Sequence, residues 1–160
     1  MLETRVRSSN KERISRRLFR GWKSVTNHSQ FLLGRIWILW NPSSVQFTVI
    51  SVSNQVIHVR LVIEDTDVYV SIIYGSYDYK EKRDLWSNHI HHSIKFSDKP
   101  WAIHGDFNVS RFPFGHSGVR LVLCKMMKEF KVCISKCDEP IISTLNVSDA
   151  RDIITFLSTI

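Results

Sequence analysis

The run KPWAIHGDFNVSR, residues 99–111, is the stretch that decides how this chain is interpreted. Its apolar part is typical of a short strand, and alternation along a strand would place His104, Asp106 and Asn108 on one face. An ionised Asp can bind a hard cation or orient a water, and Asn can donate to a phosphate oxygen. On spacing alone, an Asp-x-Asn that begins a turn or caps a helix is the commoner arrangement.

Four strand-like runs precede this stretch, and helical patterns begin near Asp78 and Val119. In the first helical pattern, residues 80–84 are charged and are expected to face solvent. Strands followed by alternating helix and strand predict an α/β (α+β) sheet protein. The second strand has apolar residues on both faces, which predicts a strand covered on both sides. The expected strands are RIWILW (35–40), VQFTVISVS (45–53), QVIHVRLVI (55–63) and VYVSIIYGS (68–76).

The composition suits one globular domain. The chain has 160 residues and an apolar fraction of 43%, enough to bury a core without disulfides or metals. The most apolar run, residues 31–40, contains Arg35 and is far too short to span a bilayer. The N-terminus is charged from its third residue and has no secretory core. We therefore expect an intracellular protein, in the nucleus or cytoplasm, with reduced cysteines, no membrane association and no stable protein partner.

The net charge of +7 is concentrated near the N-terminus. Residues 1–23 hold eight Lys or Arg against two Glu, a net charge of +6. The spacing predicts a short basic helix over about residues 10–20. Such a cluster suits a nucleic-acid backbone, and a solvated helix face is the equally frequent alternative. The candidate nucleic-acid-binding residues are Arg13, Arg16, Arg17 and Arg20.

Several segments, in a fixed order, resemble the endonuclease/exonuclease/phosphatase superfamily. More narrowly, they are similar to the apurinic-endonuclease-like domain of plant LINE-type non-LTR retrotransposons. The resemblance implies a four-layer α/β/β/α sandwich, incomplete at both ends, with residues 1–137 as a partial domain and 138–160 as a divergent tail. The segments are LETRV (2–6), GRIWILWNPS (34–43), VSIIYGSYDYKEKRDLW (70–86), KPWAIHGDFNVSR (99–111), HSG (116–118) and MKEFKVCISKC (127–137).

The resemblance also implies a role for each matching residue. Glu3 matches the Glu that holds a divalent cation, Mg²⁺ or Mn²⁺, and Tyr74 matches the Tyr that contacts the scissile phosphate. Asp106 matches the Asp on the metal side that positions and activates the attacking water. Asn108 matches the Asn that holds the phosphate and the attacking group. The implied reaction is hydrolysis of DNA, in which a hard cation and hydrogen-bond donors stabilise the charge that develops on the phosphodiester.

Departures from the family pattern predict weak or absent activity. In the family, a strand with a Trp-Asn motif precedes the metal-binding Glu, whereas only Met1 and Leu2 precede Glu3. Tyr77 stands where related sequences commonly carry Asn. The family also ends in a Ser-Asp-His motif, and NVSDARD (146–152) lacks the His. Because the members of a catalytic set act as a unit, losing some of them removes most of the rate enhancement.

Other interpretations stay open at this point. His104 shares a strand face with Asp106, but a structural histidine is commoner than a replacement for the missing His. His89, His91 and His92 are spread around a helix, which favours a solvated or part-buried face over a metal cluster. The whole chain could instead be a non-catalytic relic that binds nucleic acid through its basic segment, or a reading frame with no selected function.

Overall fold

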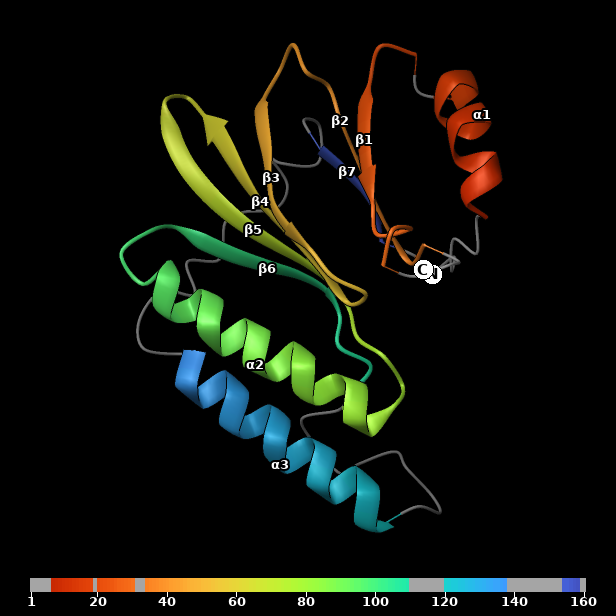
Figure 1. Ribbon diagram of the computed structural model, residues 1–160. Coiled ribbons are helices and arrows are strands. Elements are labelled where there is room, and N and C mark those ends of the chain that lie inside the picture. The colour runs from red at the N-terminus through yellow and green to blue at the C-terminus, as the bar shows by residue number, and fades with distance from the viewer. Residues whose placement is uncertain (1–6, 19, 31–33, 110–119, 138–153, 159–160) are drawn as a thin grey trace.

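The computed structural model describes residues 7–18, 20–30, 34–109, 120–137 and 154–158. Within them the chain forms three α-helices and two β-sheets, a mixed α/β architecture. In Figure 1 the helices α2 and α3 cover one side of the larger sheet, and the smaller sheet and α1 lie on its other side. The elements are α1 Ser8–Leu18, β1 Lys23–Thr26, β2 Ile36–Trp40, β3 Gln46–Val52, β4 Val56–Ile63, β5 Thr66–Tyr74, α2 Tyr79–Lys95, β6 Trp101–Asp106, α3 Arg120–Cys137 and β7 Ile154–Ser158.

The strand order brings two strand ends together. The larger sheet has the order β3-β4-β5-β6 and the smaller sheet the order β1-β2-β7. β5 and β6 are parallel, and the other paired strands are antiparallel. α2 makes the crossover that parallel neighbours require. The C-terminal ends of β5 and β6 therefore lie side by side, with Tyr74 opposite Asp106.

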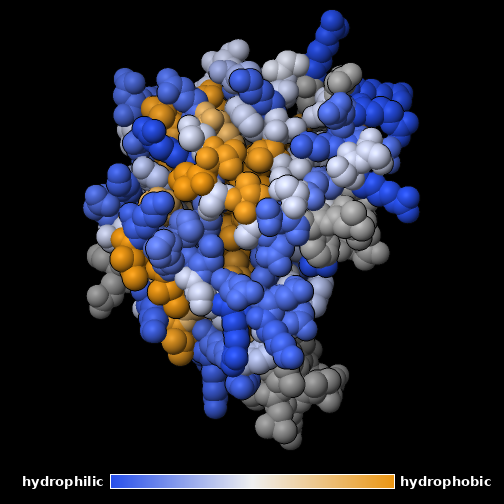
Figure 2. Space-filling model, in the orientation of Figure 1, coloured by the Kyte–Doolittle hydropathy of each residue, from blue (hydrophilic) through white to orange (hydrophobic). Residues whose placement is uncertain are grey.

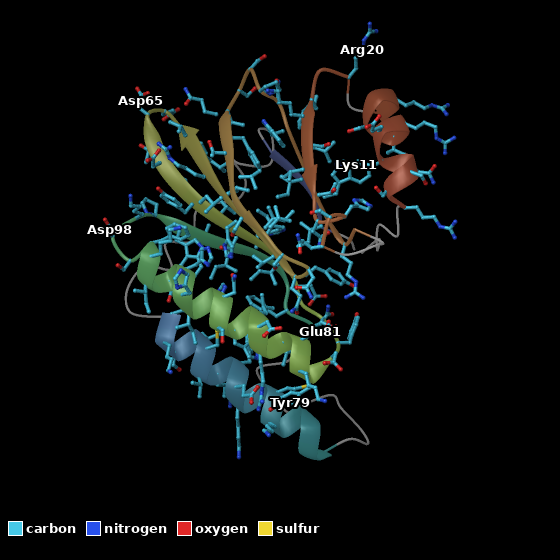
Figure 3. All side chains as sticks on the ribbon, in the orientation of Figure 1. Lys11, Arg20, Asp65, Tyr79, Glu81 and Asp98 are labelled. Carbon is cyan, nitrogen blue, oxygen red and sulfur yellow. The ribbon has the colours of Figure 1, made fainter. Side chains whose placement is uncertain are left out.

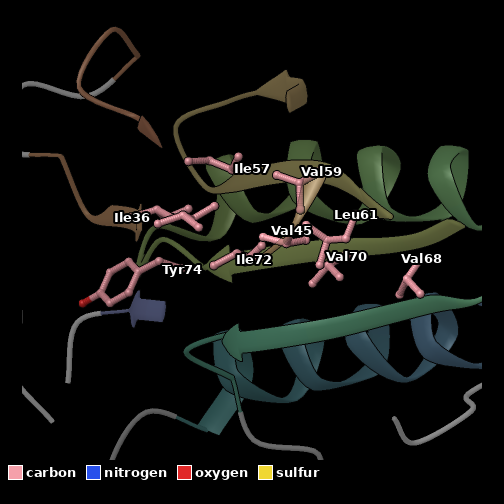
Figure 4. Close-up of a cluster of buried hydrophobic side chains, with 10 residues drawn as sticks. Ile36, Val45, Ile57, Val59, Leu61, Val68, Val70, Ile72 and Tyr74 are labelled. Carbon is pink, nitrogen blue, oxygen red and sulfur yellow. The ribbon is translucent and has the colours of Figure 1, made fainter. Parts of the chain in front are cut away.

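The larger sheet has a hydrophobic core on each face. Alternation along β4 sends Ile57 and Val59 toward the smaller sheet and Val56 toward the helices. Figure 4 shows the first core, which joins strands of both sheets. In the second core, Val56 and Ile73 pack against side chains of α2 and α3. The buried residues that the two helices contribute to it are Leu85, Trp86, Phe130 and Cys133.

Most of the predicted elements are confirmed. The expected strands correspond to β2, β3, β4, β5 and β6, and the expected helices to α1, α2 and α3. The sequence did not reveal β1 or β7. The prediction that β3 is covered on both sides is wrong, because none of its residues is fully buried and Val49 is 39% exposed. Across the described residues, none of the helices is long and apolar enough to cross a membrane.

Candidate functional site

β6 leads into a tight turn, residues 106–108, which we call the 106–108 turn. The strand ends at Asp106, and Asn108 has a left-handed backbone with a φ of +51°, which Asn tolerates better than most residues. The Asn108 N–H donates to Asp106 Oδ1 at 2.8 Å, as in an Asx turn. Asn108 therefore does not continue the strand face of Asp106. The prediction that the two residues share a strand face is wrong, whereas the commoner arrangement, an Asp-x-Asn that begins a turn, is confirmed.

Two hydrogen bonds join the 106–108 turn to Gly75 at the end of β5. The Gly75 N–H donates to the Asp106 carbonyl at 2.7 Å, and Asn108 Nδ2 donates to the Gly75 carbonyl at 2.6 Å. A Cβ atom at Gly75 would lie 2.4 Å from the Phe107 carbonyl oxygen. A Cβ atom at Gly105 would lie 1.9 Å from a backbone oxygen of β5, and the φ of Gly105 is +137°. Only glycine allows these two segments to approach so closely.

Helix α2 begins directly beside this turn. The Asp78 side chain caps the helix by accepting from the Lys80 and Glu81 N–H groups at 2.8 and 3.1 Å. Gln55 ties the helix to the sheet, because its Nε2 donates to the Glu81 carbonyl and its Oε1 accepts from the Ser76 N–H, both at 2.7 Å. The first turn of α2 is thus fixed against the C-terminal ends of β5 and β6.

Lys82 reaches the 106–108 turn from α2. Its side chain is fully buried, and its Nζ donates to the Asn108 carbonyl. Burial lowers the pKa of Lys82 to about 8, while the nearby Asp106 carboxylate acts in the opposite direction. The prediction that residues 80–84 all face solvent is wrong at this position. The signal that could have revealed it is the i, i+3 spacing from Lys82 to the buried Leu85.

Tyr74 lies in register with Asp106 on the adjacent strand. Its side chain is only 5% exposed and belongs to the core between the two sheets. The Arg35 guanidinium carbon is 5.4 Å from the centre of the Tyr74 ring, a cation–π distance. The structure therefore brings three of the predicted site residues, Tyr74, Asp106 and Asn108, to one end of the larger sheet.

The remaining predicted metal ligand, Glu3, lies outside the described residues. Within them, no group of three or more His, Cys, Asp or Glu side chains is arranged to hold a metal ion. Mg²⁺ is commonly held by one or two carboxylates, with waters and substrate phosphates in its other positions. The Asp106 carboxylate, with one oxygen bonded to Asn108, fits that limited requirement.

The predicted nucleic-acid-binding residues lie on or just after α1. Arg13, Arg17 and Arg20 are exposed, and for Arg16 the structure describes only the backbone. Figure 2 shows hydrophilic surface over α1, and Figure 3 shows α1, between the labelled Lys11 and Arg20, well separated from the α2 and α3 pair. The basic surface and the 106–108 turn are therefore separate regions.

A second polar region lies between α2 and the larger sheet. It contains the buried side chains of His58, His89 and His92, which we call the histidine cluster. The rings of His58 and His92 are stacked with their centroids 3.6 Å apart. The expectation of a solvated or part-buried face fits the exposed His91 but is wrong for His89 and His92. Their burial follows from the packing of α2 on the sheet.

Burial keeps His58 in its neutral form, with hydrogen bonds to both ring nitrogens. Its Nε2 is 2.6 Å from Asn88 Oδ1, which accepts only, so Nε2 carries the hydrogen. Its Nδ1 is 2.6 Å from Ser71 Oγ, and that oxygen also accepts from Trp101 Nε1 at 2.7 Å. Because the neutral ring has its one hydrogen on Nε2, the Ser71 hydroxyl donates to Nδ1. Burial lowers the pKa of His58 to about 3, although the bond to Asn88 opposes this shift.

His89 has a different environment. Neither of its ring nitrogens has a hydrogen-bond partner among the described residues. The ring packs against Trp101 and Phe107, with centroids 4.9 and 5.8 Å away. Burial lowers the pKa of His89 to about 4, and the charge of His92 acts in the same direction.

A groove of about 400 Å³ lies between α2 and α3. Arg83 and Glu129 form an ion pair of 3.0 Å in its wall, and Trp86 and Val132 supply apolar surface. None of the predicted site residues lines this groove, so it is distinct from the 106–108 turn.

No protein-family model matches this chain, and no curated protein matches it. Conclusions about function therefore depend on the residues and geometry described above.

Proposed function

We propose that this chain carries a divalent-metal-dependent phosphodiesterase site that acts on DNA, much more slowly than a complete site of its type would. The observation that carries the proposal is the meeting of Tyr74, Asp106 and Asn108 at the C-terminal ends of two parallel strands. In open α/β sheets, ligands bind at this end of the strands. The domain would be of the endonuclease/exonuclease/phosphatase type, related to the domain of plant LINE-type retrotransposons.

Each residue would contribute a separate function to the hydrolysis. Asp106 would use its second carboxylate oxygen to bind the cation or orient the attacking water, since Oδ1 already accepts from Asn108. Asn108 gives one amide hydrogen to Gly75 and has a second for a phosphate oxygen. The Tyr74 hydroxyl would donate to the same phosphate. A bound Mg²⁺ or Mn²⁺ would stabilise the negative charge that develops on the phosphodiester.

Two features of the geometry support a low rate. Tyr74 is 5% exposed, and the Asn108 side chain is bonded to the backbone of Gly75. Both side chains would have to shift to meet a substrate in full. Because small errors in the position of catalytic groups reduce the rate steeply, we expect turnover far below that of a preorganised site.

The proposal includes a finer description of the fold. The α2 and α3 pair, the larger sheet, the smaller sheet and α1 would be the four layers of an α/β/β/α sandwich. The hydrophobic core shared by the two sheets supports this arrangement. The position of α1 beside β1, with Ser15 Oγ 3.4 Å from Ser24 Oγ, also supports it.

A plasmid-nicking assay tests the proposed activity. The purified chain should convert supercoiled plasmid to open circles with Mg²⁺ or Mn²⁺ and should stop when the cation is chelated. Asp106→Ala should lower the rate about a hundredfold or more, because the residues of a catalytic set act as a unit. Asp98→Ala is the matched control, since Asp98 is exposed and lies at the other end of α2. Absence of metal-dependent nicking, or nicking unchanged by Asp106→Ala, would contradict the proposal.

A second candidate function is nucleic-acid binding without catalysis, favoured by the exposed Arg13, Arg17 and Arg20. Binding of a fluorescent DNA duplex should weaken steeply with salt, because each phosphate contact releases counterions. Replacing Arg13, Arg16, Arg17 and Arg20 with Gln should reduce the slope of log affinity against log salt by about 0.9 for each lost contact. Asp106→Ala should leave this binding unchanged. An affinity for DNA that changes neither with salt nor with the Arg replacements would exclude this function.

A further inference from the structure

Lys82 is an unusual residue in this fold. Among the Lys, Arg, Asp and Glu side chains that the structure describes, only Lys82 is buried, with an exposure of 0%. It lies in the N-terminal part of α2, where its own N–H donates to the Asp78 carbonyl at 3.2 Å. A charged side chain is almost never fully buried unless it has a specific partner. The partner therefore indicates what the residue does.

The partners of Lys82 are in the 106–108 turn. Its Nζ donates to the Asn108 carbonyl, and its charge interacts favourably with the Asp106 carboxylate. The Asn108 backbone that Lys82 contacts is left-handed, with a φ of +51°. In that conformation the Asn108 N–H points at Asp106 Oδ1 and its Nδ2 at the Gly75 carbonyl. One ammonium group thus contacts the backbone that orients both polar side chains of the turn.

Burial is unfavourable for a lysine at this position. Burial lowers its pKa to about 8, so its surroundings disfavour the charged form despite the attraction of Asp106. Replacing a whole buried ion pair with apolar side chains is often neutral or stabilising, so a buried charge is weak evidence for a role in stability. A buried lysine with a lowered pKa beside a turn of polar side chains is typical of a functional site.

We propose that Lys82 is a positioning residue, which acts through the Asn108 carbonyl to hold Asp106 and Asn108 in the arrangement the site uses. The inference rests on the proposed function in treating the 106–108 turn as a site, while the contact between Lys82 and the turn is independent of it. Lys82 does not touch the substrate in this scheme. Its effect is on the orientation of Asp106 and Asn108.

Amide hydrogen exchange separates positioning from stability. In Lys82→Met the Asn108 N–H should exchange about ten- to a hundredfold faster, the effect of losing one hydrogen bond to a charged group. The urea midpoint of Lys82→Met should change much less than this local effect, because relief from burying the ammonium offsets the loss of its bond to the Asn108 carbonyl. Lys82→Arg, which keeps a donor, should restore slow exchange at Asn108. Lys80→Met, on the exposed side of the same helical turn, should change neither quantity.

The opposite pattern would overturn the inference. If Lys82→Met lowers the urea midpoint while exchange at Asn108 is unchanged, Lys82 is only a structural residue. A measurement on the unaltered chain is independent of any effect on folding: the ¹⁵N signal of the Lys82 ammonium should show protons protected from solvent and coupled to the Asn108 carbonyl carbon. Ammonium protons that exchange as fast as those of Lys80 would also overturn it.

The nicking assay distinguishes failure of this inference from failure of the proposed function. If the unaltered chain nicks DNA, Lys82→Met should lower kcat about tenfold or more with a smaller effect on KM, and Lys82→Arg should recover part of the loss. If it does not nick DNA, the proposed function fails, and hydrogen exchange at Asn108 still decides whether Lys82 positions the turn.

Discussion

Helix α2 packs beside two polar regions of the larger sheet, the 106–108 turn and the histidine cluster, which are built in opposite ways. In the turn, Asp106 and Asn108 bond to each other and to the backbone of Gly75. In the histidine cluster, side chains from distant segments meet, and both ring nitrogens of His89 lack a partner among the described residues. The turn is therefore held by local geometry, whereas the cluster depends on keeping its rings neutral.

Acid should affect the histidine cluster first, and this is the largest effect we expect. Burial lowers the pKa of His58 to about 3 and that of His89 to about 4, from the ordinary 6.5. Between pH 6.5 and these lowered values, the unfolded chain binds more protons than the folded chain. The contribution of the two neutral rings to the free energy of unfolding is complete above pH 6.5 and is lost as the pH falls toward 3. At pH 4 the free energy of unfolding should be lower by about 3 kcal/mol for each ring. Urea unfolding followed by tryptophan fluorescence across this range measures it.

Single replacements show whether the cluster causes the acid sensitivity. His89→Leu should remove a large share of the loss between pH 7 and pH 4, while His91→Leu should have a much smaller effect, because His91 is exposed and acts only through its charge on His92. The other groups that interact with His58 are His92 and Lys95, whose positive charges also disfavour its protonation. An acid transition that stays the same in His89→Leu would place its cause outside the cluster.

The close approach behind the 106–108 turn should give the next largest effect. In Gly105→Ala, the new Cβ atom would meet the Ile73 carbonyl oxygen at 1.9 Å, in a backbone with a φ of +137°. We expect a loss of about 3 to 5 kcal/mol in the free energy of unfolding. Gly21→Ala is the control, since Gly21 has a φ of +86° but no atom within 4 Å of the new Cβ. It should lose only about 1 kcal/mol, and equal losses at the two positions would show that the contact with Ile73 is unimportant.

The two regions also differ in how far they could be predicted from sequence. Strands β2 to β6 and the helices follow from periodicity, because apolar residues repeat along them at the period of each element. Asp106 and Asn108 could be singled out because they are two residues apart in one motif. A turn was the commoner arrangement expected for Asp-x-Asn, but strand alternation gives no indication that Asn108 takes a left-handed backbone.

The histidine cluster and Lys82 could not be identified in the same way. His58 is 30 residues from Asn88, its hydrogen-bond partner, and no short motif links them. Lys82 stands in a charged run, and its burial depends on how α2 docks onto the ends of β5 and β6. Tertiary packing determines the burial and the partners of these residues. Their only local sign is the helical spacing of Lys82, Leu85 and His89, which all face the sheet.

Replacing Asn108 separates backbone strain from hydrogen bonding in the turn. Asn108→Gly keeps a residue that accepts the φ of +51° but loses the 2.6 Å bond to the Gly75 carbonyl, so we expect a loss of about 1 kcal/mol. Asn108→Ala loses the same bond and adds left-handed strain, for a total of about 2 to 3 kcal/mol. Urea midpoints of the two variants provide the comparison. If Ala is tolerated as well as Gly, the left-handed backbone is not what Asn108 provides.

The smallest effect should have the opposite sign. At pH 7, His89→Leu replaces two buried nitrogens that lack partners among the described residues with an apolar side chain of similar volume. Because leaving a polar group buried and unbonded costs about 1 to 3 kcal/mol and repacking offsets part of this gain, we expect a stabilisation of about 1 kcal/mol. His58→Leu is the matched contrast, since it strands Ser71 and Asn88, which now bond to the ring, and should destabilise the fold. If both variants destabilise the fold equally, the ring nitrogens of His89 contribute to stability. The histidine cluster would then be stabilised by its polar groups, as the 106–108 turn is.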